Sequence, residues 1–273
     1  MSTTTGPTAV GGTRHTLRVL AWEWRATLQG AAEYRTDLVT GTLVSVLWLA
    51  ISAVPSLVVS LHTDGAGGWT LPRLMYLLAV WYLMDAVMWI VVMPNISAWG
   101  EMVRTGSLDA ILLRPVDSLL LASLRTFGVQ DAPKILLAIG LGVASVAAGG
   151  GPQGAWAVLG SVVCVLCGMV LMWAAAVLAC VRTLSQVQFD ASFLVHAGLN
   201  LARVPVPLYG GVVTVLLTWV VPVAFVATVP AQVMFGMVTP WVVLAGVALA
   251  AAAVGLAVLA WRSELRRYAG AMS

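Results

Sequence analysis

The chain has 273 residues, of which 60% are hydrophobic and only 9% are charged, and its mean hydropathy is +0.96. A globular domain in water carries about 25% charged residues, so most of the surface of this protein must face lipid. The 14 basic residues and the net charge of +3 are too sparse for a nucleic-acid surface. The composition therefore excludes a nucleic-acid partner and predicts an all-α integral membrane protein.

The N-terminal segment, residues 1–39, is predicted to stay in the cytosol. Charged residues are spread through it from Arg14 to Arg35, and it has neither an uninterrupted apolar core nor a small-residue cleavage site, so it is not a signal peptide. Residues 14–35 predict an amphipathic helix in the inner headgroup plane, because apolar residues recur at the helical period. The predicted apolar face consists of Leu17, Leu20, Ala21, Trp24, Leu28 and Ala31.

Six apolar runs are long enough to cross the roughly 30 Å of membrane hydrocarbon as helices. The third run has Asp131, Pro133 and Lys134 at its start, so this span either begins after them or kinks at Pro133. The runs predict a six-span membrane domain over residues 40–261 and a cytosolic tail over residues 262–273. The predicted spans lie near residues 40–61, 74–97, 129–149, 156–181, 209–229 and 241–261.

Basic residues set the orientation of these spans. With the N-terminus inside, every lysine and arginine except Arg73 falls in a cytosolic segment, whereas the opposite orientation would reverse that ratio. We therefore expect a multi-pass protein of the cell (inner, cytoplasmic) membrane with both termini in the cytosol. The expected external loops are residues 62–73, 150–155 and 230–240, and the expected cytosolic segments between spans are residues 98–128 and 182–208.

Prolines mark the region before the last span. Pro222 lies inside the fifth run, and Pro230 and Pro240 follow it. This spacing predicts a helix that stops short of the outer surface, followed by a short re-entrant segment. The last span carries a face of small residues on which another helix can approach closely. That face consists of Gly246, Ala250, Ala253 and Ala257.

No catalytic, metal or nucleotide site is recognisable in the sequence. Lys134 is the only lysine and lacks the glycine spacing of a Walker A loop, so the chain cannot hydrolyse ATP alone. Asp85 is the only carboxylate deep in a predicted span, and the histidines are scattered, which argues against an intramembrane hydrolase. Cys164 and Cys167 have no second cysteine pair or flanking histidine, so we interpret them as packing residues. We predict that the chain is not an enzyme and needs no cofactor.

A short helix is predicted at residues 107–114, between the second and third spans. Ser107 suits its N-cap, Asp109 favours its first turn, and Pro115 ends it. Its apolar residues share one face. From the pattern alone, that face either sinks into the headgroup layer or docks on a partner. The face consists of Leu108, Ile111 and Leu112.

The run from Gly106 to Pro115 has the pattern G-x-L-D-x-x-L-x-R-P, which resembles a signature of the permease subunits of type-2 ABC exporters. The resemblance is to the six-span branch whose members are viologen- or multidrug-exporter-like. It extends over most of the chain, from about residue 20 to residue 268. Further agreement lies in Val221–Phe225, Pro230–Ala231, Trp261 and Leu265–Tyr268.

The resemblance implies a half-transporter that exports a small amphipathic or drug-like substrate. A second permease subunit, the same chain or a related one, and two cytosolic ABC ATPase subunits would complete the exporter and power it. The helix at residues 107–114 would be a coupling helix, whose apolar residues act as knobs in a cleft of the ATPase while Asp109 and Arg114 orient it at the rim. The implied coupling residues are Gly106, Leu108, Asp109, Ile111, Leu112, Arg114 and Pro115.

Asp85 is the residue whose role the sequence leaves open. A carboxylate near the middle of the bilayer costs a few kcal/mol on insertion scales, so it must be protonated, paired or exposed to a wet cavity. A helix places it beside tryptophans, where it could receive a lipophilic cation as part of a substrate path. The interpretation that we favour from the sequence is a structural aspartate at a subunit interface. The candidate path residues are Trp81, Asp85, Met88 and Trp89.

A secondary transporter or channel-like protein is the alternative function. It would need ion-coupling polar groups that face a cavity, and the sequence offers Asp85, Asp190 and His196. A tightly associated ATPase would support the exporter, and a fully active lone chain would support the alternative.

Overall fold

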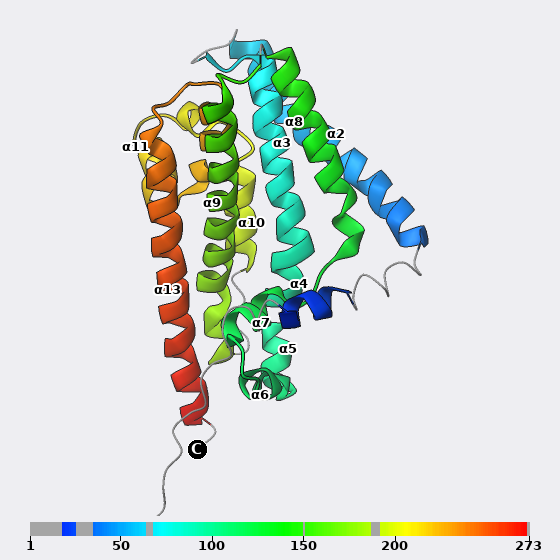
Figure 1. The fold of residues 1–273 in the computed structure, drawn as a ribbon, viewed down its shortest axis with the longest axis vertical. Helices are drawn as coiled ribbons and strands as arrows, with labels where there is room; N and C mark the ends of the chain where they lie inside the picture. The colour runs from blue at the N-terminus through cyan, green and yellow to red at the C-terminus, as the bar shows by residue number, and fades with distance from the viewer. Residues whose placement is uncertain (1–17, 26–34, 64–67, 150, 187–191, 272–273) are drawn as a thin grey trace, which may run out of the picture.

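The computed structural model describes residues 18–25, 35–63, 68–149, 151–186 and 192–271, and every structural statement below concerns these residues. Within them the chain is helical, with turns between the helices and no β-strand. Figure 1 shows most of the long helices running side by side along the long axis of the molecule. The prediction of an all-helical protein is therefore confirmed.

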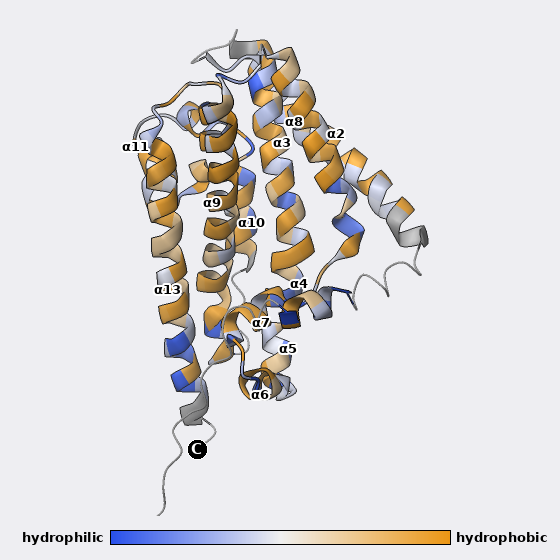
Figure 2. Cartoon of the chain, in the orientation of Figure 1, coloured by the Kyte–Doolittle hydropathy of each residue, from blue (hydrophilic) through white to orange (hydrophobic). Residues whose placement is uncertain are grey.

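Five helical segments are long and apolar enough to cross a membrane, and they match the first four predicted spans and the sixth. Figure 2 shows apolar residues along the middle of these helices and hydrophilic residues on the last turns of α13. The candidate spans are Val39–Leu61, Leu71–Arg104, Val129–Ala148, Ala155–Leu184 and Trp241–Tyr268. The helices that make up most of their length are α2 (Arg35–Thr63), α3 (Leu71–Val87), α8 (Pro133–Ala148), α9 (Ala155–Cys180) and α13 (Trp241–Ala271).

The second span contains an irregular turn where a proline interrupts it. A π-helical turn (Met88–Val92) separates α3 from α4 (Met93–Ile96). Pro94 has no N–H to donate to the carbonyl of Ile90, four residues earlier, and its ring crowds that carbonyl, so a wider turn absorbs the misfit. The N–H of Gly128 donates to the carbonyl of Ile90 instead, at 2.8 Å. The irregular turn is therefore bonded to the segment that leads into the third span.

Three short helices lie between α4 and the third span, and the first of them ends the second span. They are α5 (Trp99–Arg104), α6 (Ser107–Leu112) and α7 (Ser118–Leu124). Figure 1 shows them at one end of the molecule, together with the N-terminal helix of residues 18–25 and the last turns of α13. We call this end the α6 end.

The α-helix of the third span begins at a proline. A 3₁₀ turn (Val129–Asp131) precedes α8, and Pro133 is the first residue of the helix, where its missing N–H leaves no hydrogen bond unmade. The structure matches neither alternative in full, because the candidate span runs from Val129 to Ala148 and its α-helix starts at Pro133.

The fifth predicted span is not a continuous helix. The prediction of one apolar helix over residues 209–229 is wrong, because the chain leaves helical geometry at Val221 (φ −114°, ψ 91°). Pro222 follows, and the residue before a proline is disfavoured in the α conformation. The interrupted segment also starts earlier than predicted, with α10 (Ser192–Leu201), which packs against α9 and α3. It continues as a 3₁₀ turn (Val206–Tyr209), α11 (Gly211–Val215) and a π-helical turn (Leu216–Val220).

A short buried helix precedes the last span, in the region of the predicted re-entrant segment. A 3₁₀ turn (Val223–Phe225) leads into α12 (Thr228–Met234), whose residues are buried except for the half-buried Gln232. α12 packs against α9 and α3, and the hydroxyl of Ser161 on α9 donates to the carbonyl of Pro230 at 2.9 Å. The segment is thus held inside the protein, at the end opposite to α6 (Figure 1).

The last span packs on α9 through its predicted face of small residues. Ala250 and Ala257 on α13 are buried. A Cβ added to Gly246 would lie 2.9 Å from the ring of Phe225 and 3.9 Å from Cβ of Cys167 on α9. The predicted close approach of another helix to this face is confirmed.

The N-terminal helix of residues 18–25 packs on the protein. Leu20 is buried, and the indole N–H of Trp24 donates to the carbonyl of Leu124 at the end of α7, at 2.7 Å. Trp22 is 73% exposed. Of the other residues predicted on the apolar face, Ala21 is exposed, and Leu17, Leu28 and Ala31 lie outside the described residues.

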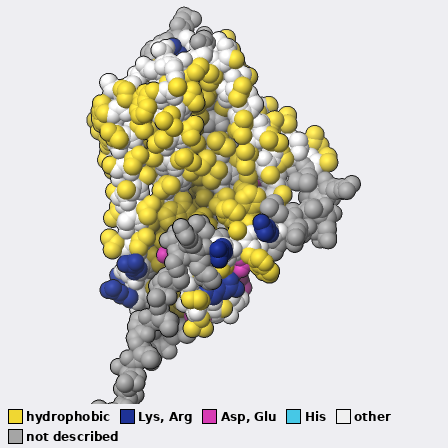
Figure 3. Space-filling view, viewed as in Figure 1, with side chains coloured by type: hydrophobic (Ala, Val, Ile, Leu, Met, Phe, Trp, Pro, Cys, Tyr) yellow, Lys and Arg dark blue, Asp and Glu magenta, His cyan; other side chains and the backbone are white. Residues whose placement is uncertain are grey.

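Charged residues are distributed unevenly along the molecule. Figure 3 shows basic and acidic side chains gathered at the α6 end and hydrophobic side chains over the middle. Arg73, near the start of α3, lies at the opposite end and donates to the carbonyl of Gly68 at 2.7 Å. Two basic residues that we predicted in cytosolic segments, Lys134 and Arg203, instead contact side chains of α3 inside the bundle.

Candidate functional site

α6 coincides with the predicted coupling helix and is six residues long, Ser107–Leu112, shorter than the predicted range of 107–114. Its N-cap is Gly106 with φ +70°, a left-handed conformation that glycine adopts without the steric cost of a Cβ. The prediction that Ser107 is the N-cap is wrong, because Ser107 is already the first helical residue.

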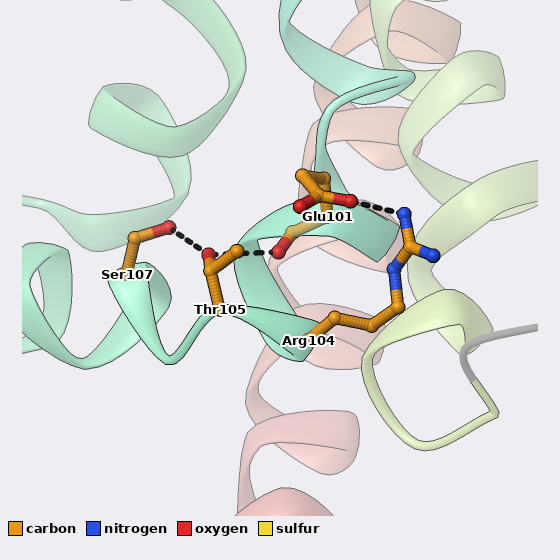
Figure 4. A network of polar contacts seen from close by, with 4 residues as sticks. All are labelled: Glu101, Arg104, Thr105 and Ser107. Carbon is orange, nitrogen blue, oxygen red and sulfur yellow. Dashed lines mark hydrogen bonds and ion pairs between the residues drawn. The ribbon is translucent and has the colours of Figure 1, made fainter.

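A small polar network stabilises the turn between α5 and α6, as Figure 4 shows. The hydroxyl of Thr105 donates to the carbonyl of Glu101 at 2.9 Å, and it lies 2.9 Å from the hydroxyl of Ser107. Arg104 forms an ion pair with the carboxylate of Glu101. Of these contacts, the one between Thr105 and Ser107 connects the end of α5 with the first turn of α6.

The apolar face of α6 points into the protein. Leu108 is fully buried, Ile111 is 3% exposed, and Leu112 is half-buried, while α6 packs against α5 and α7. In this structure Leu108 and Ile111 fill the core of their own chain, and their role as knobs for a partner's cleft stays a prediction. On the outward side, Ala110 is exposed and Leu113 is 85% exposed.

The polar residues predicted at the rim of the partner contact other parts of this chain. The hydroxyl of Tyr268 on α13 donates to Oδ1 of Asp109 at 3.2 Å. Nη1 of Arg114 donates to Oε1 of Glu23 at 3.1 Å. The side chain of Arg114 is 48% exposed, so this ion pair contributes at most about 1 kcal/mol and leaves the guanidinium accessible. The shallow groove beside it, about 460 Å³, is lined by Arg18, Val19, Trp22, Glu23 and Arg114.

Asp85 is paired inside the bundle. Its Oδ2 lies 2.9 Å from Nζ of Lys134 at the start of α8, and the same Nζ lies 2.8 Å from Oδ1 of Asp131. The side chains of Asp85 and Lys134 are 5% and 7% exposed, so salt in the solvent screens the pair little. The structure thus supports the structural interpretation of Asp85, with the partner in the same chain rather than across a subunit interface.

The other candidate path residues do not line a common opening. Trp81 is fully buried, and its indole N–H donates to the carbonyl of Leu199 at 2.7 Å. Met88 is also fully buried, whereas Trp89 is 39% exposed and its ring lies 5.0 Å from that of His196. In this conformation the four predicted residues do not form an open substrate path.

Arg203 lies beside Trp81, one of the two tryptophans at which we predicted that a cationic substrate could bind. Its guanidinium carbon lies 4.3 Å from the ring centre of Trp81 and 4.9 Å from that of Trp48, within the range of cation–π attraction. It also interacts electrostatically with Asp85. We missed this residue because its place in the sequence, between two predicted spans, indicated a cytosolic loop.

An apolar groove of about 740 Å³ lies between α3, α8 and α9. Tyr76 lies in the wall of this groove, and its hydroxyl forms a hydrogen bond of 2.9 Å with the hydroxyl of Ser161. Ala79 on α3 faces Gly142 on α8. These two small residues were the only hint of the groove in the sequence, and recognising it requires knowledge of the register between the two helices. Other lining residues include Leu83, Ile139, Val143, Val146, Val162, Leu166 and Met169.

The cysteines lie in a tightly packed part of α9. Cys164, Cys167 and Cys180 are all buried. A Cβ added to Gly168 would lie 2.6 Å from the carbonyl oxygen of Phe225, which shows how closely the chain before α12 approaches this face. Among the described residues, no three histidine, cysteine or acidic side chains lie together in a way that could hold a metal ion.

Comparison with known proteins assigns the chain to a family. The family model for "ABC-2 family transporter protein" matches residues 46–272. Searches of the curated proteins and of the solved structures return no significant match. Because the family match covers most of the chain, including α6 and all five candidate spans except the first turns of α2, the chain belongs to the ABC-2 transporter family, as its resemblance to ABC permeases predicted.

Proposed function

We propose that the chain is a permease subunit of an ABC exporter, which pairs with a second permease and is powered by cytosolic ABC ATPase subunits. Membership of the ABC-2 family supports a transport role and an ATPase partner. The observation that carries the proposal is α6, an exposed turn and helix packed between α5 and α7 at one end of an apolar bundle. A helix in this position can receive movement from a soluble partner and pass it to the spans.

The proposed contact surface for the ATPase is the outward side of α6 with the residues that follow it. Leu113 is 85% exposed, and burying a leucine in a partner's cleft contributes about 1.5–3 kcal/mol. Arg114 adjoins it and offers an accessible cation to a carboxylate on the ATPase. Leu108 and Ile111 hold the helix from inside. Gly106, Asp109, Leu112 and Pro115 stay in the proposal as residues that shape and orient it.

We place the α6 end in the cytosol and the protein in the cell membrane. Most of the basic side chains visible in Figure 3 lie at that end, in agreement with the preference of lysine and arginine for cytoplasmic loops. Both termini would then be cytosolic, because the N-terminal helix and the last turns of α13 lie at the same end.

The proposed substrate is a small amphipathic or drug-like molecule. The groove between α3, α8 and α9 supports this class, because its volume of about 740 Å³ and its apolar lining suit a lipophilic molecule that arrives from the bilayer. A path along Trp81, Asp85, Met88 and Trp89 would require the ion pair between Asp85 and Lys134 to open.

The experiment that tests this function is a Leu113→Asp substitution in the exporter reconstituted with its ATPase. A charge at this position would be buried without a partner in the proposed cleft, so binding of the ATPase should weaken by at least about tenfold while the permease still inserts and folds. Leu113→Met is the matched control and should bind normally. Normal binding by Leu113→Asp would refute the contact surface, and transport by the lone chain without ATP would favour a secondary transporter.

A further inference from the structure

α7 (Ser118–Leu124), the short helix after the coupling helix, is held by hydrogen bonds from four tryptophans. Each tryptophan belongs to a different part of the chain: the N-terminal helix, α5, α9 and α13. We call these four indoles and their acceptors the tryptophan clamp. The bonds are Trp24 to the carbonyl of Leu124 at 2.7 Å, Trp99 to the carbonyl of Ala122 at 3.1 Å, Trp173 to Oγ of Ser123 at 3.1 Å, and Trp261 to Oγ of Ser118 at 3.1 Å.

The chemistry of α7 explains why indoles bind there. The last four carbonyls of a helix have no partner inside it, and the carbonyls of Ala122 and Leu124 belong to that last turn. An indole is a donor only, so it satisfies such a carbonyl while its ring packs in apolar surroundings. Ser123 is fully buried and uses its hydroxyl twice, since it accepts from Trp173 and donates to the carbonyl of Leu119 at 2.7 Å.

The segment after α7 is held to the second span as well. Nδ2 of Asn95 donates to the carbonyl of Thr126 at 2.8 Å, and Oδ1 of Asn95 accepts the N–H of Thr126 at 2.8 Å. Two residues later, the N–H of Gly128 donates to the carbonyl of Ile90 in the π-helical turn. The chain from α7 to the third span is therefore fixed in register against the second span.

We propose that the tryptophan clamp transmits movement of the coupling helix to the spans, so that Trp99, Trp173 and Trp261 are positioning residues for energy coupling. This inference rests on the proposed function of the chain as an exporter permease. Apolar packing alone lets helices slide, whereas a hydrogen bond is directional and holds its two partners in one register. α7 packs on α6, and its clamp reaches α5, α9 and α13, so a displacement of α6 is shared among the second, fourth and sixth spans.

The test uses two donor–acceptor pairs in the exporter reconstituted with its ATPase. Trp173→Phe keeps an aromatic ring and removes the N–H, and Ser123→Ala removes the acceptor with little change in volume. Trp261→Phe and Ser118→Ala form the second pair. Each variant should keep basal ATPase activity but transport about fivefold less substrate per ATP, the factor expected for one lost hydrogen bond.

The two changes within a pair should not add, because either one removes the same bond. The matched control is Trp241→Phe on the first turn of α13, whose ring stacks on that of Trp219 at 6.4 Å near the opposite end, and it should couple normally. A purely structural role would lower ATPase activity and transport together or leave both unchanged, and either result overturns the proposal.

The outcomes separate this inference from the proposed function. If the wild-type chain does not bind an ATPase or does not transport with ATP, the proposed function fails. If the wild type transports and all four variants keep its ratio of transport to ATP hydrolysis, the clamp proposal fails while the function stands. The serine variants keep the test decisive even where a tryptophan variant does not fold.

Discussion

Loss of the lysine charge at position 134 should destabilise this protein far more than loss of an exposed basic residue. In Lys134→Met, two carboxylates lose their cation, and the side chain of Asp85 is only 5% exposed. Breaking a buried ion pair by removing one partner costs about 3–5 kcal/mol, because an uncompensated charge stays in the interior. Arg203 interacts with Asp85 and offsets part of this cost, so we expect about 3 kcal/mol.

The matched control is Arg104→Met. Arg104 also pairs with a carboxylate, that of Glu101, but the two side chains are 66% and 57% exposed. Exposed pairs contribute about 0–1 kcal/mol, so this variant should unfold at nearly the wild-type temperature. The two substitutions remove the same kind of pair and differ mainly in burial.

The assay is thermal unfolding of the purified chain in lipid nanodiscs. For chains of this size 1 kcal/mol corresponds to roughly 2–4 °C in Tm, so Lys134→Met should lower Tm by roughly 6–12 °C. Combining it with Asp85→Asn should recover part of the loss, since the double variant no longer buries an unpaired carboxylate at position 85. A Tm for Lys134→Met within a degree or two of that of Arg104→Met would refute the reasoning.

Three further predictions address transport, the coupling helix and orientation. Asp85→Asn alone should transport cationic and neutral substrates with unchanged relative rates, and a selective loss of cationic ones would restore Asp85 to the substrate path. Gly106→Ala forces a Cβ into a left-handed conformation and should cost about 1–2 kcal/mol and lower coupling, whereas Gly255→Ala in the exposed middle of α13 should cost nothing, as unfolding midpoints would report. A cysteine replacing Gln153 should react with an impermeant thiol reagent from outside intact cells, and reaction only after permeabilisation would reverse the orientation.

The sequence predicts the long helices well because hydropathy over about 20 residues is a property of one segment. It failed at the fifth span for a related reason. Pro222 was recognised as an interruption, but the segment begins with α10, which precedes Arg203 in the chain. A charged residue at position 203 indicates a loop as long as its contacts with tryptophans are unknown. The π-helical turn at Met88–Val92 is likewise explained by Pro94 only once Gly128 is seen to bond the freed carbonyl.

The candidate site shows the same limit. The pattern from Gly106 to Pro115 located the short helix α6, and periodicity grouped Leu108 with Ile111 correctly on one face. Periodicity does not say whether such a face meets the chain's own core or a partner, and burial decides that it meets the core. The partner of Asp85 lies 49 residues away on another helix, so it depends on the register of α3 against α8, which no local pattern contains.

The burial of the apolar face of α6 also constrains how this helix can move. For α6 to move alone, Leu108 and Ile111 would have to leave the core, and exposing two such side chains costs about 3–6 kcal/mol. The contact between the hydroxyls of Thr105 and Ser107 would be lost as well. A movement of α5, α6 and α7 as one block keeps these contacts and changes only those at its border. The clamp residues Trp173 and Trp261 lie at that border, which is why their hydrogen bonds, rather than the knobs of α6, should control how much of an ATPase movement reaches the spans.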